Sequence, residues 1–289
     1  MISFQKIEMI IGFERGLMIL FETEPIQNNY FLKIKCYIYA KVMSNKFKNF
    51  EIMRTLLILC IFIISTNFCF ARNFSTLEEK VEHYKNRYKV ECLNQRITDN
   101  RGNGFEELYG TRNMRTILFG VAYRGGGNNY FHRTNKRENR NPLPNDGLEN
   151  LNNEGFSKAV YLYLTNFSTA PRYVTNGTDT LRYVQNSGLT RNTQKEILQI
   201  VYDRINEPNL GPVYLHCWNG WHQCGFIAAL VLMQFCGFSN EKALKYWYMN
   251  AEGTKGFDTV KRMMSEFKPF DDFQIAQETQ ELICPCFEK

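Results

Sequence analysis

The sequence lacks the features that would place it in an extreme class of protein. It has no internal repeat and no low-complexity tract, which argues against solenoid and fibrous architectures. Of its 289 residues, 44% are hydrophobic and 22% are charged, so a packed core is expected and disorder is not. The length suits one large domain or two small ones.

A strong excess of one charge is also missing. The net charge is +6, and the first 71 residues carry eight Lys or Arg against five Asp or Glu. The remainder therefore has a net charge of only +3. Nucleic-acid-binding domains are much more basic than this, so we expect no nucleic acid among the partners of this protein.

A long hydrophobic run is the third missing feature. Residues 53–71 begin with Met53 and Arg54, continue with the short apolar core Leu56–Ile64, and end in the small-x-small sequence Cys69–Ala71. This pattern is typical of a secretory signal peptide and is too short to cross a membrane comfortably. The alternative is a short membrane anchor with a cytoplasmic N-terminus.

The position of this run suggests how the chain is organised. Because the run starts at a methionine, we interpret residues 1–52 as an over-extended gene model and residues 53–71 as the leader. Residues 72–289 then form one domain that is secreted or periplasmic, with no stable membrane insertion after cleavage. Its six cysteines can form disulfides in an oxidising compartment, and we expect Cys92 to pair with one of the two C-terminal cysteines.

Strand-like and helix-like segments alternate along this domain, which favours an α/β fold with a mostly parallel sheet. We expect strands at 115–126, 158–164 and 212–216, and loops at 127–146 and 165–189. Helices are expected at 75–91 with a Ser75/Glu78 capping box, at 146–155 closed by Gly155, at 190–206, at 225–235, after Gly237 with Ser239 as N-cap, and at 257–267.

The chain has four histidines and three tryptophans, and two of each lie in the segment VYLHCWNGWHQCGFIAAL, residues 213–230. This segment runs from a buried strand through a loop into an apolar helix. Loops at the carboxyl ends of strands in such sheets bind ligands, and backbone N–H groups followed by a helix N-terminus attract anions. A cysteine at this place should have a lowered pKa and act as a thiolate nucleophile.

The segment His216-Cys217-x-x-Gly220-x-x-Gln223-Cys224-Gly225 resembles the signature His-Cys-x-x-Gly-x-x-Arg-Ser/Thr-Gly of cysteine-based protein tyrosine and dual-specificity phosphatases. The upstream sequences YRGGGNN and LENLNNEGFSKAVYLYL resemble the corresponding stretch of atypical dual-specificity phosphatases. The similarity covers roughly residues 115–267. It implies a small, mostly parallel central sheet flanked by helices.

The resemblance also implies a role for particular residues. Cys217 would attack the phosphorus atom and form a phosphocysteine, and His216 would support its thiolate. The backbone of the loop would cradle the phosphate, with the positions Trp218, Asn219, Gly220, Trp221, His222 and Gln223. The general acid would come from the loop after strand 158–164, where Asp179 is the only carboxylate between residues 166 and 191.

Two departures from the signature set the expectations for activity. Gln223 replaces the arginine that binds the phosphoryl oxygens, and losing one such donor costs about 10²–10³ in rate. Cys224 replaces the Ser or Thr and could form a disulfide with Cys217. His222 or Arg124 could supply the missing positive charge, while Trp218 and Trp221 would make the rim apolar.

Other interpretations of the segment remain open. Cys217 could be a small core residue, and His216, Cys217, His222 and Cys224 could form a zinc site, although their spacing is unusually compact. We expect no metal and no cofactor. The sequence predicts an exported phosphatase-like protein that binds a phosphorylated substrate or ligand and could hydrolyse it through Cys217. The alternative is an inactive pseudophosphatase that binds a phosphorylated ligand.

Overall fold

The computed structural model describes residues 8–13, 17–24, 33–40, 74–127, 142–165, 167–251 and 256–288, in two compact units, 1–69 and 70–289. In the first unit, strands β1 (Glu8–Phe13), β2 (Leu17–Glu24) and β3 (Lys33–Ala40) form an antiparallel sheet. The predicted leader, residues 53–71, lies outside the described residues. No described helix is both long enough and apolar enough to cross a membrane.

The second unit is an α/β domain built on a six-stranded mixed sheet, as the sequence predicts. Its strands are β4 (Thr111–Leu118), β5 (Ala122–Gly127), β6 (Lys158–Tyr161), β7 (Tyr173–Thr175), β8 (Thr180–Gln185) and β9 (Val213–Cys217), in the spatial order β4-β5-β9-β6-β8-β7. The four central strands are parallel, and the two outer strands are antiparallel to their neighbours. The central strand β9 is buried along its whole length, as a parallel strand covered on both faces should be.

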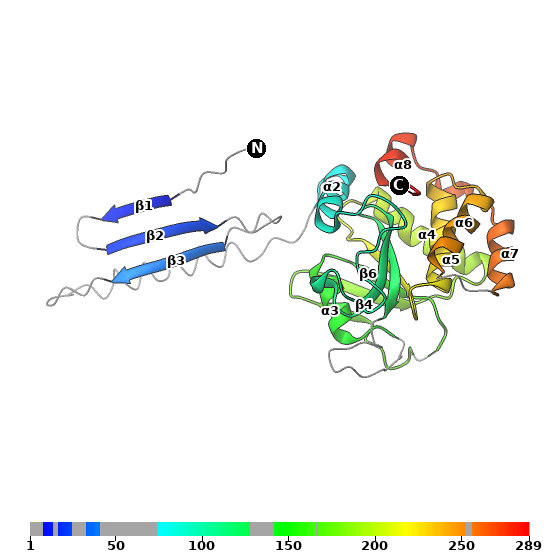
Figure 1. The fold of residues 1–289 in the computed structure, drawn as a ribbon, viewed down its shortest axis with the longest axis horizontal. Helices are drawn as coiled ribbons and strands as arrows, with labels where there is room; N and C mark the ends of the chain where they lie inside the picture. The colour runs from blue at the N-terminus through cyan, green and yellow to red at the C-terminus, as the bar shows by residue number, and fades with distance from the viewer. Residues whose placement is uncertain are drawn as a thin grey trace. The chain divides into compact units, whose positions relative to one another are not determined.

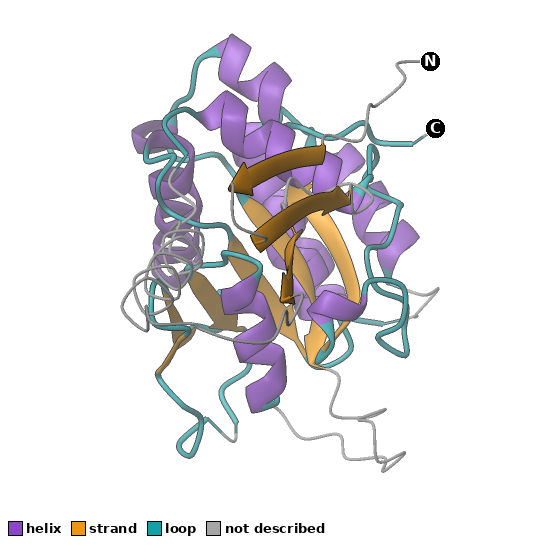
Figure 2. Cartoon of the chain, turned by 90° about the vertical axis from the view of Figure 1, so that its left-hand side faces the viewer, coloured by secondary structure: helices purple, strands orange, loops and turns teal. Residues whose placement is uncertain are grey.

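Helices cover both faces of this sheet (Figures 1 and 2). The helices are α2 (Leu77–Tyr88), α3 (Asn145–Asn153), α4 (Arg191–Asn206), α5 (His222–Phe235), α6 (Asn240–Asn250), α7 (Asp258–Glu266) and α8 (Gln277–Ile283). In Figure 1, α4 to α7 gather on one side of the sheet and α2 and α3 on the other. Helix α5 packs on β4, β5 and β9, which places the start of α5 beside the centre of the sheet.

Several helix boundaries follow the sequence signals. Helix α4 begins after Thr190, whose hydroxyl accepts the N–H of Thr193, and α6 begins after Ser239, as predicted. Helix α3 is followed by Gly155 at φ +85°, also as predicted. The first cap is shifted by one residue, because the N-cap of α2 is Thr76 and not Ser75.

Two strand predictions are wrong. Residues 115–126 are part of a hairpin and not a single strand, because Gly120 adopts φ +68° and turns the chain between β4 and β5. Residues 165–189 are not one loop, because they contain β7 and β8. In β8 the inward side chains Leu181 and Tyr183 alternate with exposed ones, which is the two-residue period of a half-buried strand. The predicted loop at 127–146 lies mostly outside the described residues.

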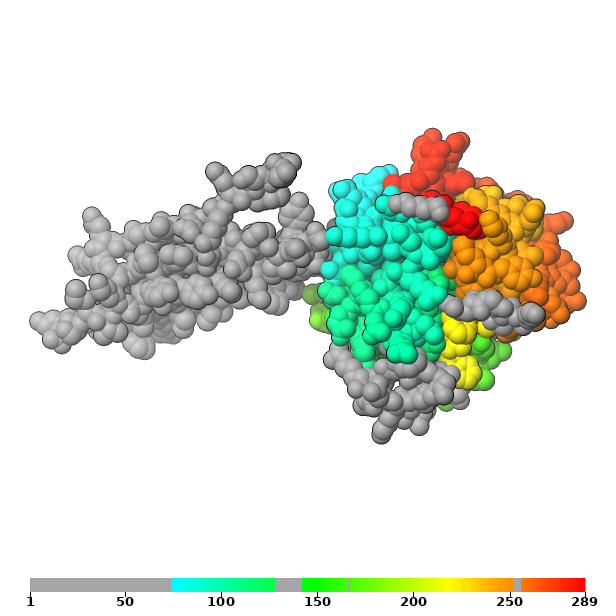
Figure 3. All heavy atoms as spheres, viewed as in Figure 1, coloured from blue at the N-terminus to red at the C-terminus, as the bar shows by residue number. Residues whose placement is uncertain are grey.

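Two disulfides attach the C-terminal segment to the rest of the second unit. Cys92 pairs with Cys286, which confirms the predicted link to the C-terminal pair, and Cys236 pairs with Cys284. Figure 3 shows the red C-terminal segment against the cyan start of the unit. Disulfides of this kind persist in oxidising compartments.

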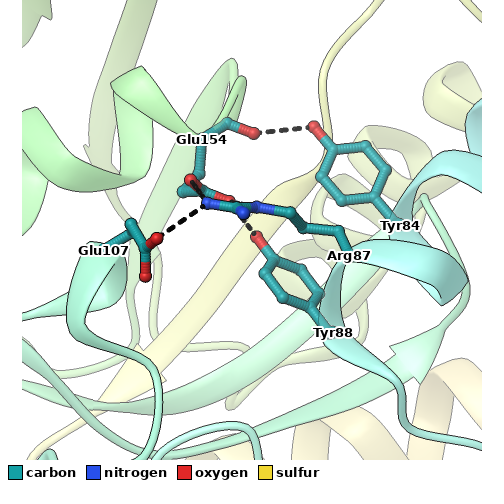
Figure 4. A network of polar contacts seen from close by, with 5 residues as sticks. All are labelled: Tyr84, Arg87, Tyr88, Glu107 and Glu154. Carbon is teal, nitrogen blue, oxygen red and sulfur yellow. Dashed lines mark hydrogen bonds and ion pairs between the residues drawn. The ribbon is translucent and has the colours of Figure 1, made fainter. Parts of the chain in front are cut away.

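An ion-pair network fixes α2 to the turn after α3 (Figure 4). The guanidinium of Arg87 donates two hydrogen bonds to the carboxylate of Glu154, at 2.8 and 3.1 Å. The hydroxyl of Tyr88 donates to the same carboxylate at 3.2 Å, and the hydroxyl of Tyr84 donates to the Glu154 carbonyl at 2.9 Å. Because Glu154 is buried, its carboxylate would be costly without a partner, and the bidentate contact with Arg87 provides one.

Helix α2 also carries a fully buried lysine. The Lys80 Nζ atom donates to the Arg204 carbonyl at 2.6 Å and to the Leu210 carbonyl at 3.2 Å, which fixes α2 to the end of α4. Burial, and then the positive charge of Arg204, lower the pKa of Lys80 to about 7. The folded protein therefore loses this proton at a pH at which the unfolded chain still holds it.

We predict that Lys80 makes the protein more stable as the pH rises above 7. Between pH 7 and the usual lysine pKa of about 10.4, the unfolded chain binds one more proton than the folded chain. The free energy of unfolding should therefore rise by up to about 1.4 kcal/mol per pH unit through this group. Urea denaturation at pH 7, 8 and 9 should show this rise in the wild type and a smaller one in Lys80→Met.

The matched control is Lys85→Met, which removes an exposed lysine from the same helix. This variant should keep the wild-type dependence on pH. Equal slopes in the wild type and Lys80→Met would contradict the prediction.

Candidate active site

The predicted loop lies at the carboxyl edge of the sheet, between β9 and α5, and it is held in place by the β4–β5 hairpin. The Asn219 carbonyl accepts a hydrogen bond from Asn113 Nδ2 at 2.8 Å, and the Trp218 carbonyl accepts one from the Gly127 N–H at 3.2 Å. Gly220 has φ +78°, and a Cβ atom there would lie 2.8 Å from the backbone of Gly125 and its neighbour. Glycine is therefore required at position 220 for two separate reasons.

The Cys217 sulfur is the focus of this loop. The thiol is buried, with 2% of the residue exposed. Burial by itself raises the pKa of this thiol, but hydrogen bonds from the Cys224 thiol and from the backbone N–H groups of Cys224, Gly220 and Trp221 outweigh it and lower the pKa to about 6. The sulfur is thus predominantly a thiolate at neutral pH, which supports the expectation of a nucleophile at this position.

Cys224 acts here as the hydrogen-bond partner of that thiolate. The two sulfur atoms are 3.4 Å apart, and neither cysteine is in a disulfide. Burial raises the pKa of Cys224, and the neighbouring Cys217 raises it further. Cys224 therefore keeps its proton at neutral pH, and its S–H group can donate a hydrogen bond to Cys217. The phosphatase signature has a Ser or Thr hydroxyl at this position.

His216 is neutral and fully buried behind the loop. Burial lowers the pKa of its ring to about 3. Its Nδ1 atom lies 3.1 Å from the Cys217 carbonyl, which can only accept a hydrogen bond, so the proton is on Nδ1. Its Nε2 atom then accepts from the hydroxyl of Tyr183 at 2.8 Å, and that hydroxyl accepts from the Leu143 N–H at 3.0 Å. These hydrogen bonds fix the His216 ring at the end of β9. Because the ring is neutral, it adds no positive charge to the site.

Arg124 holds the loop from behind. Its Nη1 atom donates to the carbonyls of Gly220 at 2.8 Å and Trp221 at 3.3 Å, and it lies 3.5 Å from Cys224 Sγ. Because the N–H groups of the loop face Cys217, its carbonyl side faces away from the anion. The expected direct contact of Arg124 with a phosphate is therefore wrong in this geometry, and the fully buried arginine supports the loop instead.

Neither of the other two expected phosphate ligands on α5 directs its side chain at the thiolate. The ring of His222 stacks on Phe257 with 4.2 Å between centroids, and burial lowers its pKa, so it is mostly neutral at pH 7. The side-chain amide of Gln223 donates to the Ser187 carbonyl at 2.6 Å, in the loop after β8. The positive charge expected from His222 is therefore not supported. The Gln223 side chain instead connects the start of α5 to the loop after β8.

Asp179 is at the wrong end of the sheet to be the general acid. It directly precedes β8 and lies in a hollow with Ser157 and Gly211, which precede β6 and β9. From the strand register, Asp179 lies about seven residues from the level of Cys217, or roughly 20 Å. A carboxylate at that distance cannot protonate a leaving group in the loop, so this assignment is corrected.

Sequence reasoning missed three residues around the loop. Asn113 holds the loop from a β4 bulge, where it adopts φ +50°. Arg112 is buried, donates to Asn100 Oδ1 at 2.6 Å, and its positive charge interacts with Cys217. Tyr163 follows β6, and burial together with the neighbouring Cys217 and Cys224 raises its pKa. The sequence predicts a strand only from residue 115, so Asn113 and Arg112 fall outside it, although both lie in β4.

The two tryptophans of the loop differ in exposure. Trp218 is 39% exposed, whereas the Trp221 Nε1 atom is buried. Among the described residues, no three His, Cys, Asp or Glu side chains are grouped so that they could hold a metal ion. The alternative of a zinc site formed by His216, Cys217, His222 and Cys224 therefore finds no support in the geometry.

The similarity to known proteins lies in the fold. No protein-family model and no curated protein sequence matches the chain. It is similar to the solved structure of Cydia pomonella PTP-2 phosphatase, with 13% identity over 58% of this chain and 94% of the other, and a TM-score of 0.35. PTPMT1 in complex with PI(5)P gives 12% identity over 53% and 92%, with a TM-score of 0.38.

A third similar structure is the core catalytic domain of the PP-IP phosphatase SIW14 from S. cerevisiae, with 14% identity over 56% and 88% of the two chains and a TM-score of 0.37. The first and the third of these structures are named as phosphatases. The chemistry of the site follows from the residues of this chain.

We predict that the Cys217 thiolate forms with a midpoint near pH 6 and that the Cys224 thiol is responsible for part of this shift. Thiolate absorbance at 240 nm, titrated on the reduced protein with Cys217→Ser as the blank, measures the midpoint. Cys224→Ala removes the S–H donor, so its midpoint should move up toward the usual thiol value of about 8.5.

The matched control is Cys224→Ser, which keeps an O–H donor and should keep the midpoint close to that of the wild type. A wild-type midpoint above pH 8 would contradict the thiolate assignment. An unchanged midpoint in Cys224→Ala would contradict the role of Cys224.

Proposed function

We propose that this protein is an exported phosphatase-like protein that binds a phosphomonoester in the loop at residues 217–223, with Cys217 as the nucleophile. The observation that carries this proposal is the convergence of backbone N–H groups on a thiolate whose pKa is about 6. The same donors are suited to phosphoryl oxygens, and the start of α5 adds partial positive charge. The two disulfides support export to an oxidising compartment, secreted or periplasmic.

The reaction that this geometry supports has two steps. The Cys217 sulfur attacks phosphorus, an S–P bond forms, and the ester P–O bond breaks with its electron pair going to the leaving oxygen. Water then attacks phosphorus, and the S–P bond breaks to return the thiolate and release inorganic phosphate. Without a carboxylate placed as general acid, the first step favours a leaving group that needs no proton, such as an aryl oxide.

The competing proposal is a pseudophosphatase that binds a phosphorylated ligand without turnover. The contact of the Gln223 amide with the Ser187 carbonyl favours it, because no cation of α5 then faces the phosphoryl group. Losing one donor of this kind costs about 3–4 kcal/mol of transition-state stabilisation. We therefore propose binding as the principal function and hydrolysis through Cys217 as a slow activity.

We predict slow turnover of an aryl phosphate by the reduced wild-type protein, no turnover by Cys217→Ser, and a gain of about 10²-fold or more in Gln223→Arg. The gain is expected because an arginine can bind the phosphoryl oxygens in a bidentate manner and strengthens as charge develops. Steady-state release of the aryl alcohol measures turnover, and calorimetry with inorganic phosphate measures binding.

Gln199→Arg, on the exposed face of α4, adds the same charge away from the site and should change neither quantity. Phosphate binding without turnover in the wild type, together with activity in Gln223→Arg, would establish the pseudophosphatase. Neither binding nor turnover in any variant would reject both proposals.

A further inference from the structure

The turn between β7 and β8 contains an asparagine in an N-x-Ser/Thr sequence. The chain has three such sequences, which begin at Asn73, Asn166 and Asn176, and the last of these asparagines lies among the described residues. It begins the sequence Asn176-Gly177-Thr178. In an exported protein this pattern is an acceptor for an N-linked oligosaccharide, provided that it lies on the surface.

The turn is exposed and has room for a bulky group. Asn176, Gly177 and Thr178 are all exposed. They follow Thr175, whose partner in the strand register is Thr180 at the start of β8, so they form the tip of a hairpin. Gly177 has φ +95°, and a Cβ atom at this position would meet nothing within 4 Å. The surface requirement of the sequence pattern is therefore met.

The turn holds the Asn176 side chain by its oxygen. Oδ1 accepts the N–H groups of Thr178 at 3.1 Å and Asp179 at 2.9 Å, and the Thr178 hydroxyl donates to the same oxygen at 3.0 Å. The Nδ2 atom makes a long contact of 3.5 Å with Asn153 Oδ1, which is weak for a hydrogen bond. The fold therefore uses the amide oxygen and leaves the amide nitrogen, which carries the glycan in a glycoprotein, at the surface.

This turn lies at the amino edge of the sheet, away from the Cys217 loop. The Asp179 carbonyl accepts the Asn176 N–H, and Asp179 lies about seven residues, or roughly 20 Å, from the level of Cys217 in the strand register. A large hydrophilic group on Asn176 would therefore leave the loop accessible. It would also lie next to β7, an outer strand of the sheet, whose free edge benefits from a cover.

We propose that Asn176 is a glycosylation site that takes an oligosaccharide from a lipid pyrophosphate donor. The Nδ2 atom attacks the anomeric carbon, and a C–N bond forms as Nδ2 gives up one proton. The C–O bond to the pyrophosphate breaks, and its electron pair goes to the leaving oxygen. The proposal rests on the export that is part of the proposed function, because this modification is made on chains that enter the secretory pathway. It does not depend on the chemistry of Cys217.

The experiment expresses the full chain in cultured animal cells and recovers it from the medium. Trypsin cleaves after Arg172 and Arg182 and releases peptide 173–182, in which Asn176 is the single asparagine. Mass spectrometry should find this peptide predominantly with an added oligosaccharide. Because Asn-Gly sequences also deamidate spontaneously, the mass of the intact glycopeptide is the readout, and conversion of Asn176 to aspartate is not.

Two substitutions at Thr178 provide the matched control. Thr178→Ala keeps the asparagine but removes the hydroxyl of the acceptor sequence, so the oligosaccharide should be lost from peptide 173–182. Thr178→Ser keeps a hydroxyl and should keep the oligosaccharide. Asn176→Gln should also lose it, and this variant should bind inorganic phosphate as the wild type does, because the turn is remote from the loop.

The outcomes separate this proposal from the function on which it rests. Secreted chain with an unmodified peptide 173–182 overturns the glycosylation site and leaves the export intact. Chain that stays inside the cells without an oligosaccharide overturns both the site and the export. An oligosaccharide on this peptide in the wild type, and its absence in Thr178→Ala, supports the site whether or not the protein hydrolyses a phosphomonoester.

Discussion

The hydrogen bonds that converge on the Cys217 sulfur are the interaction on which the candidate site depends. They are made by neutral groups: the backbone N–H groups of Gly220, Trp221 and Cys224, and the Cys224 thiol. Each of these groups must hold its place for the thiolate to remain stable inside the protein, where an unpaired charge is very costly. The positions of Gly220, Asn113 and Arg124 around the loop follow from that requirement.

The support of the loop comes from the β4–β5 hairpin more than from α5. The hairpin contributes the Asn113 amide, the close backbone approach at Gly126, and the Arg124 guanidinium. Arg124 is permanently charged, because its interactions with Tyr246, Cys224 and the Cys217 thiolate outweigh its burial and raise its pKa. One face of the loop is therefore braced by a cation, while the other presents N–H groups to an anion. A buried arginine in this role stabilises the conformation of the loop from its carbonyl side.

Much of this arrangement could be predicted from the sequence where the signal is local. The start of a helix near residue 190, the N-cap at Ser239, Gly155 after α3 and the strand–loop–helix order around Cys217 depend on near neighbours, and the structure has them as predicted to within one residue. Asp179 was misplaced because its position depends on the unrecognised β7–β8 hairpin, which reverses the chain and returns it to the amino edge of the sheet. The sequence predicts that Arg124 lies beside the loop, and it does, but on the carbonyl side and not on the side of the Cys217 sulfur. The direction of a β5 side chain depends on strand pairing, which the sequence does not reveal.

The balance of charge at the site decides between binding and turnover. A phosphate anion that enters the loop meets the Cys217 thiolate, and two unit charges about 4 Å apart repel by about 4 kcal/mol at an effective dielectric constant of 20. In a complete signature the arginine offsets this repulsion, whereas here Gln223 donates to the Ser187 carbonyl and His222 is mostly neutral at pH 7. The backbone donors and the charge of Arg112 remain near the sulfur. Under the proposed function these groups would favour the retention of a phosphomonoester, and they would provide little of the additional charge that a rapid attack on phosphorus requires.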